Sequence, residues 1–300
     1  MNSVPEFLNE KLNRQYGEEI AAQIVAGYAQ ARPVTLRVNT LKTDVPAVCK
    51  AFSDCGISFC GVPWFSGALV LNGVREEEIR KTALYERGEI YLQSLSSMLP
   101  PLFLGVKAGE SVLDMTAAPG GKTTEISALT GGQAFITACE KDKIRAERLK
   151  YNLAKQGAPR VSVLCEDATK LDEFFSFDRI LLDAPCSGSG TLDLRAPLKI
   201  SSKLVENCAA LQKKLLAKAL RLLKKGGTLV YSTCSVLREE NEEVLQSILP
   251  CSGCVSEPIA PFEGLPLLPS AEGTLCVAPS ALYEGFFVAR IKKVSSDGLR

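Results

Sequence analysis

Two cysteines stand in short segments that are rich in small and polar residues. Cys186 lies in the segment Asp-Ala-Pro-Cys-Ser-Gly, and Cys234 lies in Tyr-Ser-Thr-Cys-Ser. Each segment directly follows an apolar run that is typical of a buried strand in a parallel sheet. Because ligands bind at the carboxyl ends of such strands, we expect both thiols to face a bound molecule rather than to fill the core.

Acidic side chains also mark the ends of four successive predicted strands, at Asp114, Glu140, Asp167 and Asp183. At these places Glu140 could accept hydrogen bonds from the ribose hydroxyls of an adenine cofactor, and Asp167 could accept one from the adenine amino group. A row of carboxylates favours a cofactor with a cationic, phosphate-free reactive end, such as S-adenosylmethionine. The alternative, that a carboxylate merely caps the helix that follows it, stays open for any single residue.

Two thiols beside a methyl donor indicate methylation of a pyrimidine at C5. The C5 atom is too weakly nucleophilic to attack a sulfonium methyl group directly, whereas addition of a thiolate to C6 makes C5 enamine-like. The C5 proton must leave after methyl transfer, and expulsion of the thiol then needs a second acid or base nearby. Asp183 could hydrogen-bond the ring N3 and the amino group, which favours cytosine as the target.

A glycine-rich loop, DMTAAPGGKT, joins a predicted strand that ends at Asp114 to the predicted helix over about residues 122–129. Its GKT end fits the second half of a phosphate-binding P-loop. However, Thr116 stands where that motif needs its first glycine, and Pro119 removes one backbone N–H from the loop. A P-loop nucleotide hydrolase is therefore the weaker alternative, and it gives the two cysteines no role.

The first part of the chain is predicted to contain both helices and strands. Residues 1–105 are expected to form a small α+β domain, with a helix over residues 5–29 and a strand over residues 34–41. A further helix is expected over residues 45–52, where Asp44 or Thr43 can cap it, and two short strands follow.

From residue 106 to residue 300 the pattern changes, because short apolar runs alternate with helical segments. The helices are expected at about residues 122–129, 143–156, 203–223 and 238–247. This alternation predicts an α/β fold in which helices cover both faces of a parallel sheet. Residues 274–277 and 285–291 are expected to form an antiparallel pair at the edge.

The composition excludes several classes of function. The chain has 300 residues, 46% of them hydrophobic, a net charge of +1 and no histidine. Without histidine there is no Ser-His-Asp triad and no His-containing zinc site, so no metal is expected. The only CxxC pair, Cys251 and Cys254, is expected in an exposed loop between Pro and Gly residues.

The sequence also predicts a cytoplasmic protein. It contains no apolar run of the roughly 18 to 20 residues that a membrane span needs, and its first residues lack a signal peptide pattern. Its cysteines are therefore expected to stay reduced, and no membrane partner is expected.

Three segments closely resemble the signature blocks of the Sun/Nop family of RNA cytosine-C5 methyltransferases: DMTAAPGGKTT, ILLDAPCSGSGTLD and GGTLVYSTCSVLREENEEVL. RPVTLRVNTLK, IYLQSLSSMLPP and EGFFVARIKK match as well, so the resemblance covers about residues 33–293. It implies a class I, Rossmann-like methyltransferase domain over residues 106–300, preceded by a small α+β RNA-recognition domain over residues 1–105. It also implies S-adenosylmethionine as the cofactor and RNA, either transfer or ribosomal, as the substrate.

The resemblance assigns roles by matching positions. Cys234 of the TC motif is implied to be the nucleophile, and Cys186 of the PC motif is implied to assist product release. The exchanged assignment stays open, because a PC cysteine is the nucleophile in DNA-directed relatives of this chemistry. Asp183 and Lys122 complete the implied catalytic set. The implied cofactor-binding residues are Thr116, Ala117, Ala118, Pro119, Gly120, Gly121, Lys122, Glu140, Arg145, Asp167 and Asp183.

RNA binding leaves no mark on the bulk charge, since basic and acidic residues nearly balance. We expect Arg37 and Lys42, which flank a predicted strand end, to contact RNA, and we expect a monomer. A non-catalytic RNA-binding assembly factor is a third functional class. The intact cysteines, glycine loop and carboxylates argue against it.

Overall fold

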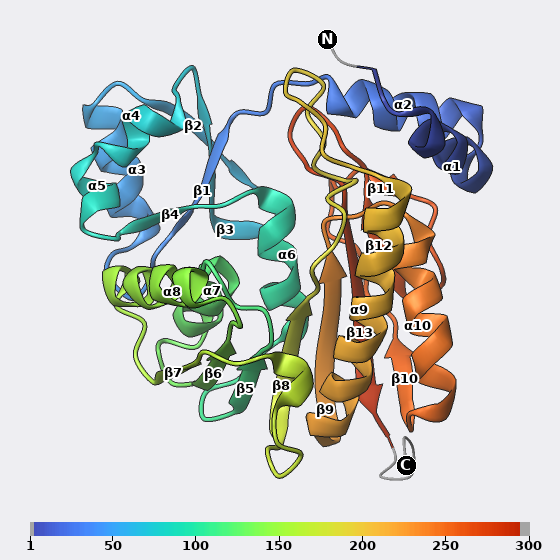
Figure 1. The fold of residues 1–300 in the computed structure, drawn as a ribbon. Helices are drawn as coiled ribbons and strands as arrows, with labels where there is room; N and C mark the ends of the chain where they lie inside the picture. The colour runs from blue at the N-terminus through green and yellow to red at the C-terminus, as the bar shows by residue number, and fades with distance from the viewer. Residues whose placement is uncertain (1–2, 295–300) are drawn as a thin grey trace. The chain divides into compact units, whose positions relative to one another are not determined.

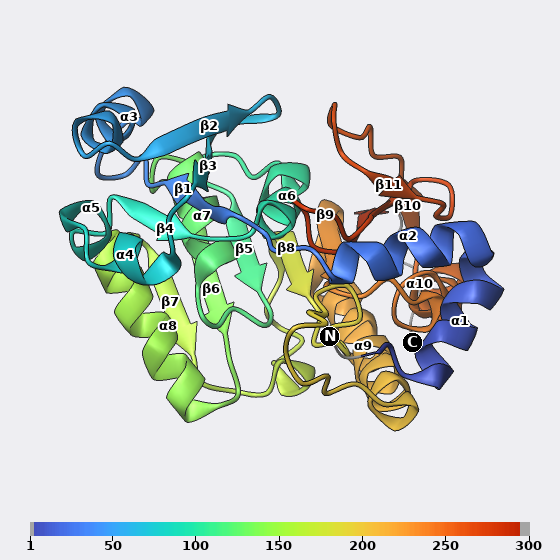
Figure 2. The ribbon, with the colours of Figure 1, turned by 90° about the horizontal axis from the view of Figure 1, so that it is seen from above.

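The computed structural model describes residues 3–294 and divides into two compact units. The first unit combines the described parts of residues 1–32, 172–261 and 265–300, and the second combines residues 33–171 and 262–264. In Figures 1 and 2 the first unit carries the dark blue and the yellow to red elements, and the second carries the light blue to green elements.

The second unit begins with a four-stranded antiparallel sheet in the order β2-β3-β1-β4. Its strands are β1 (Val34–Val38), β2 (Ser58–Val62), β3 (Phe65–Asn72) and β4 (Ile90–Leu92). Three short helices accompany it: α3 (Val45–Asp54), α4 (Glu76–Arg80) and α5 (Ala83–Glu86). The Asp44 side chain accepts a hydrogen bond from the Ala47 N–H at 2.8 Å, which caps α3 as predicted. Alternating apolar residues from β1 and β3, including Leu36 and Leu71, are fully buried and pack on α3.

The same unit continues with parallel strands connected by helices. The elements are α6 (Leu95–Leu104), β5 (Ser111–Asp114), α7 (Gly121–Leu129), β6 (Phe135–Cys139), α8 (Lys143–Gln156), β7 (Val161–Leu164) and the 3-10 helix η1 (Ala168–Lys170). β6 pairs in parallel with both β5 and β7. Leu149 and Leu153 of α8 pack on the alanines of the glycine loop, which holds that loop against the helix.

In the first unit, five strands lie in the order β11-β12-β13-β9-β8, and β10 pairs with β13. The strands are β8 (Phe177–Asp183), β9 (Leu223–Thr233), β10 (Cys254–Glu257), β11 (Leu267–Leu268), β12 (Thr274–Val277) and β13 (Phe286–Lys293). The helices are α1 (Glu6–Tyr16), α2 (Glu18–Tyr28), α9 (Ser202–Leu222), η2 (Arg238–Glu240), α10 (Glu242–Ile248) and η3 (Leu249–Cys251). β8 and β9 are parallel, and α9 packs along both of them (Figure 1).

Three expectations about these elements need correction. The helix expected over residues 5–29 is two helices, because Gly17 adopts a φ of 79° and interrupts the hydrogen-bonding pattern. The strand expected over residues 34–41 ends at Val38, where Asn39 begins a turn. The loop expected at the CxxC pair is wrong for Cys254, which is buried at the start of β10. The side chain of Cys251 lies outside the described part of the chain.

The expected antiparallel pair near the C-terminus is confirmed, since β12 and β13 pair from Thr274 to Val277. β13 is not an edge strand, because β9 pairs with its other side. Within residues 3–294, none of the helices combines the length and the apolar character that crossing a bilayer requires.

Candidate active site

The two cysteines of interest meet at one edge of the sheet in the first unit. β8 and β9 run in parallel with Asp183 opposite Ser232, so the loops that follow these strands leave the sheet side by side. Cys186 stands in the first loop and Cys234 in the second, and their Sγ atoms lie 2.7 Å apart. Both thiols are partly accessible and neither forms a disulfide. The structure therefore brings together the two cysteines that the sequence singled out.

A buried carboxylate joins the two cysteine loops. Glu240, at the end of η2, is fully buried and accepts hydrogen bonds from the backbone N–H and the hydroxyl of Ser187 at 2.7 and 2.6 Å. It also accepts one from the hydroxyl of Ser235 at 2.6 Å. Ser187 directly follows Cys186, and Ser235 directly follows Cys234. The sequence did not single out Glu240, which stands six positions after Cys234 among several acidic residues.

The protonation of Cys186 follows from its surroundings. Its pKa is raised well above the ordinary thiol value, first by the hydrogen bond with Cys234, then by burial, and further by the charges of Cys234 and Glu240. Cys186 is therefore a protonated thiol at neutral pH and can donate to the neighbouring sulfur. In this contact either sulfur can be the donor to the other.

Asp183 lies at the end of β8, as expected. Its Oδ1 atom accepts a hydrogen bond from the hydroxyl of Ser232 at 2.7 Å. The side chain is only partly buried, so it is accessible from the edge of the sheet where the cysteine loops begin. Its position is compatible with contact to a base that reaches the two thiols.

The glycine loop in the second unit differs from a P-loop. Its last glycines lead into α7, where Gly120 adopts a φ of 106° and precedes the helix. A Cβ atom on Gly121 would come within 3.1 Å of the ring of Tyr91, so this turn is closely packed. The hydroxyl of Thr123, which a P-loop would direct to a metal ion, is buried and donates to Asp114 at 2.6 Å. This bond also gives Asp114 a structural partner.

Two predicted cofactor carboxylates lie at the ends of neighbouring strands. Glu140 follows β6 and Asp167 follows β7, and these strands are parallel. Glu140 is buried, and its Oε2 atom lies 3.4 Å from a guanidinium nitrogen of Arg145. Arg145 also donates to the carbonyl of Ala118 at 2.8 Å, which connects Glu140 to the glycine loop. The structure thus brings together Glu140, Arg145 and Ala118, three of the predicted cofactor-binding residues.

The contacts of Asp167 partly support the alternative that this carboxylate caps the helix that follows it. Its Oδ1 atom accepts hydrogen bonds from the N–H and the hydroxyl of Thr169, at 2.9 and 2.8 Å, at the start of η1. These two bonds, the hydroxyl bond first, hold the pKa of the Asp167 carboxyl below its ordinary value. It is therefore ionised at neutral pH and can accept further hydrogen bonds.

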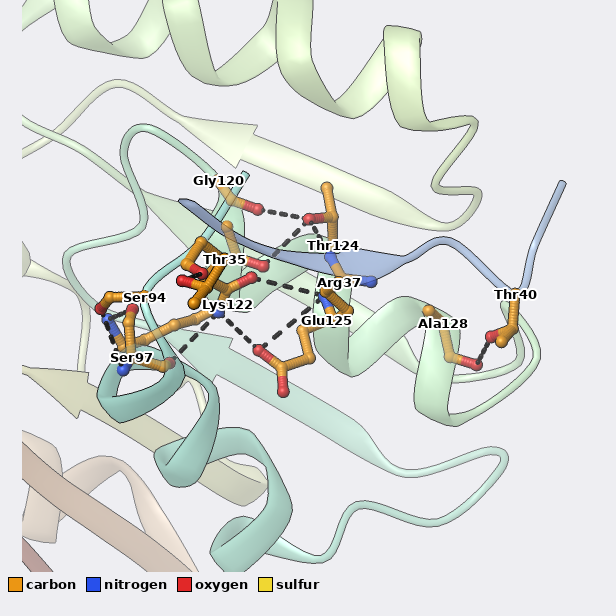
Figure 3. A network of polar contacts seen from close by, with 12 residues as sticks. Thr35, Arg37, Thr40, Ser94, Ser97, Gly120, Lys122, Thr124, Glu125 and Ala128 are labelled. Carbon is orange, nitrogen blue, oxygen red and sulfur yellow. Dashed lines mark hydrogen bonds and ion pairs between the residues drawn. The ribbon is translucent and has the colours of Figure 1, made fainter. Parts of the chain in front are cut away.

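One of the two predicted RNA contacts, Arg37, needs correction, whereas Lys42 is exposed. Arg37 is buried in the network of Figure 3, where its guanidinium donates to the hydroxyl of Thr124 at 3.0 Å and lies 4.0 Å from Glu125. A side chain with 1% exposure cannot contact RNA, so the prediction for Arg37 is wrong. Lys42 donates to the carbonyls of Arg87 and Lys155, so its ammonium group anchors local backbone.

Lys122 lies in the first turn of α7 and donates to the hydroxyl of Ser97 at 2.8 Å (Figure 3). Ser97 belongs to α6, whose first turn is capped by Ser94. The ammonium group is therefore held at one place by its bond to α6. No group of three or more Cys, Asp or Glu residues suited to a metal ion is present among the described residues.

The sequence of this chain matches a known family over most of its length. Residues 101–292 match the 16S rRNA methyltransferases RsmB/F, and residues 4–76 match the ferredoxin-like domain of RsmF/B-like methyltransferases. The chain belongs to the RsmB/F family. Its resemblance to the Sun/Nop methyltransferases is thereby confirmed, and so is the prediction of S-adenosylmethionine as the cofactor of the family.

Individual relatives of the RsmB/F family agree. The chain is 38% identical to ribosomal RNA small subunit methyltransferase F of Shewanella piezotolerans, over 87% of this chain and 58% of the relative. It is 36% identical to the protein of the same name from Vibrio vulnificus, over 98% of this chain and 65% of the relative. The chain thus spans about 58–65% of the length of these curated relatives.

A solved structure of a methyltransferase homologue supports the fold. The crystal structure of a methyltransferase homologue from Pyrococcus horikoshii superposes with a TM-score of 0.85 at 34% identity, covering 97% of this chain and 96% of the homologue. The predicted α/β fold of class I methyltransferases is therefore confirmed. The buried carboxylate of Glu140, linked through Arg145 to the glycine loop, is a hydrogen-bond acceptor of the kind that fits the ribose hydroxyls of S-adenosylmethionine.

Proposed function

We propose that this chain transfers the methyl group of S-adenosylmethionine to C5 of a cytosine in small-subunit ribosomal RNA. The observation that carries the proposal is the pair of thiols, Cys186 and Cys234, whose sulfur atoms lie 2.7 Å apart. A single thiol could serve many reactions, but two at one place suit an addition and elimination on one base. The names of the relatives support ribosomal RNA as the substrate, and transfer RNA is the alternative.

The proposed reaction begins at Cys234. As a thiolate, its Sγ atom forms a bond to C6 of the cytosine, and the electron pair of the C5–C6 double bond moves toward C5. When bound, S-adenosylmethionine supplies an electrophilic methyl group for C5. A water molecule takes the C5 proton, and the electron pair of the broken C–H bond restores the C5–C6 double bond. The S–C6 bond breaks in the same step, with its electron pair returning to Cys234.

The other residues position and assist. Cys186, whose sulfur lies 2.7 Å from that of Cys234, is proposed to assist the elimination that releases the methylated base. Asp183, held by Ser232, is proposed to accept a hydrogen bond from the cytosine amino group. Residues 116–122 with Glu140, Arg145 and Asp167 are proposed to hold the cofactor. Residues 1–105 are proposed to recognise the RNA.

Methyl transfer to defined RNA tests this function. The purified chain is incubated with S-adenosylmethionine and either small-subunit ribosomal RNA or transfer RNA, and the products are sequenced after bisulfite treatment. One protected cytosine in ribosomal RNA is expected, and none when Cys234 is replaced by Ala. Binding of RNA without protection of any cytosine in either RNA would favour the non-catalytic assembly factor instead.

A further inference from the structure

The second unit contains a cavity that the proposed chemistry does not use. It has a volume of about 510 Å³ and lies among α4, α5, α8 and β4. These elements lie next to one another in both views of the chain (Figures 1 and 2). Its lining includes three basic residues, Arg80, Arg148 and Lys155, and three tyrosines, Tyr85, Tyr91 and Tyr151, and it includes no acidic residue.

The positive charges of this cavity are crowded around one aromatic ring. The ammonium group of Lys155 lies 3.7 Å from the centre of the Tyr85 ring, and the guanidinium of Arg80 lies 5.4 Å from the same centre. Arg80 also donates to the Tyr85 hydroxyl at 2.7 Å and pairs with Glu76 outside the cavity. Burial lowers the pKa of Lys155, the charge of Arg80 lowers it further, the charge of Glu86 raises it, and that of Lys42 lowers it again. An anion bound here would relieve this repulsion.

One tyrosine and two basic residues of α8 lie together on one face of the helix, an arrangement that suits nucleic-acid binding. Arg148, Tyr151 and Lys155 follow one another at intervals of three and four residues, so they share one face of the helix. Tyr151 is 65% exposed, so its ring is accessible to a base. Aromatic rings flanked by cations bind single-stranded RNA through base stacking and phosphate contacts.

The cavity is separate from the predicted cofactor carboxylates. Neither Glu140 nor Asp167 contributes to its lining. Its cationic wall suits a phosphate, whereas the reactive end of S-adenosylmethionine is itself cationic. Pro119 of the glycine loop does line the cavity, and Asn152 of α8 donates to the Pro119 carbonyl at 2.7 Å. A ligand in the cavity therefore lies beside the cofactor loop of the same unit.

We propose that this cavity binds one nucleotide of the substrate RNA, with its phosphate at Lys155 and Arg148 and its base stacked on Tyr151. The proposal rests on the proposed function, because it assumes an RNA substrate. It assigns RNA binding to α8 and α5 of the second unit, in place of Arg37.

Equilibrium binding of a fluorescein-labelled single-stranded RNA to the full chain tests the cavity. Tyr151→Ala is expected to weaken binding about fivefold to a hundredfold, because one stacked base is lost. Lys155→Ala and Arg148→Ala should each weaken it severalfold and lower the slope of log K against log salt by about one. Phe174→Ala and Lys50→Ala remove an exposed aromatic ring and an exposed charge elsewhere, and should change affinity less than twofold.

The outcomes separate the cavity from the proposed function. If the three cavity variants bind RNA as tightly as the parent chain does, the cavity proposal is overturned, while methylation by the parent still supports the function. If the variants lose RNA binding but the parent methylates no cytosine, the cavity stands and the function fails. If the variants lose affinity for adenosine monophosphate and not for RNA, the cavity is a free-nucleotide site and the proposal is also overturned.

The contacts of Glu240 carry a second, independent inference. The structure assigns Glu240 as the positioning residue that holds Cys186 and Cys234 at their working separation. Its carboxylate binds the residue that follows each cysteine, and the hydroxyl of Tyr231 holds its backbone carbonyl at 2.6 Å. Since Ser187 and Ser235 belong to separate loops, their shared acceptor fixes one loop relative to the other.

Oxidative trapping measures this separation without RNA. A diazene dicarboxamide oxidant takes one hydrogen from each thiol, so Cys186 and Cys234 form a disulfide and the oxidant becomes a hydrazine. Glu240→Gln should slow this reaction at least tenfold and lower kcat of methylation similarly, with the Kd for S-adenosylmethionine unchanged within twofold. Ser187→Ala and Ser235→Ala, which each remove one hydroxyl, should slow trapping about twofold to fivefold.

Glu243→Gln is the matched control, because Glu243 is exposed on the same segment and should leave trapping unchanged. Thermal unfolding identifies any variant that is simply unfolded. If folded Glu240→Gln and both serine variants form the Cys186–Cys234 disulfide as fast as the parent chain does, Glu240 does not position the cysteines. This conclusion holds whatever the result of the methylation assay.

Discussion

The Sγ atoms of Cys186 and Cys234 lie 2.7 Å apart, although 48 positions separate the two residues in the sequence. This contact arises because β8 and β9 are parallel neighbours whose ends are in register at Asp183 and Ser232. Both thiols can therefore act on the same atom pair of a single base. Their roles should nevertheless be separable, because one forms a bond that the other helps to break.

Substitution of each cysteine separates attack from release. Cys234→Ala should abolish methyl transfer and covalent attachment to RNA, since the attacking sulfur is lost. Cys186→Ala should still attach to RNA and methylate C5 but release the product slowly. Denaturing electrophoresis with radiolabelled RNA should show a protein–RNA band for Cys186→Ala that is absent when both cysteines are replaced.

If Cys186 were the nucleophile and Cys234 assisted release, the two variants would behave in the opposite way. If the denaturant-stable band forms with Cys234→Ala and not with Cys186→Ala, Cys186 is the nucleophile.

Glu140→Ala should weaken binding of S-adenosylmethionine in the absence of divalent metal. Hydrogen bonds to a charged carboxylate contribute roughly 1.5–3 kcal/mol, so the Kd should rise about tenfold to a hundredfold. Isothermal calorimetry measures this change, with Glu147→Ala on the exposed face of α8 as the control. Tight binding of adenosine triphosphate without binding of S-adenosylmethionine would contradict the cofactor assignment.

Glu125 should make the stability of the chain depend on pH. Burial raises its pKa to about 8 from an ordinary 4.5, against the opposing effects of Arg37, Gln93 and Lys122. Between these values the folded state holds a proton that the unfolded state has lost, so the free energy of unfolding falls as pH rises from 4.5 to about 8. Glu125→Gln lacks this titration.

Urea unfolding of the parent and of Glu125→Gln at pH 5 to 9 checks this prediction. The stability of the variant relative to the parent should increase with pH by at most about 1.4 kcal/mol per unit and level off above about pH 8. Glu77→Gln, at an exposed position of α4, should show no such trend. A constant difference between parent and Glu125→Gln across the range would show that Glu125 does not titrate there.

Arg37→Ala should destabilise the fold without a direct effect on RNA. Its guanidinium is buried and donates to the hydroxyl of Thr124, and leaving a buried polar group without its partner costs about 1–3 kcal/mol. Lys50→Ala, at a 76% exposed side chain, should change stability by less than about 0.5 kcal/mol. Thermal unfolding measures both effects. RNA affinity of the folded Arg37 variant should stay within twofold of the parent, and a large loss would restore Arg37 as an RNA contact.

Local signals in the sequence were sufficient for many of the elements. The cap at Asp44, the apolar period of α9 and the alternation of strands with helices depend on neighbouring residues, and the structure confirms them. The positions of Cys186 and Cys234 after strands could also be predicted, because a strand end and its loop are adjacent in the chain. The motifs around them were specific enough to indicate the family.

Only the tertiary structure decided which side chains meet. Arg37 resembled a surface cation in the sequence, but Glu125, which lies beside it, comes from a helix far along the chain. Glu240 resembled one more acidic residue of a polar segment until the fold placed it between Ser187 and Ser235. Burial and hydrogen bonding of a charged group depend on residues that are distant in sequence, whereas propensity and periodicity report only on neighbours. For this reason the sequence determined the elements and the reacting thiols, and the fold determined the groups that hold them.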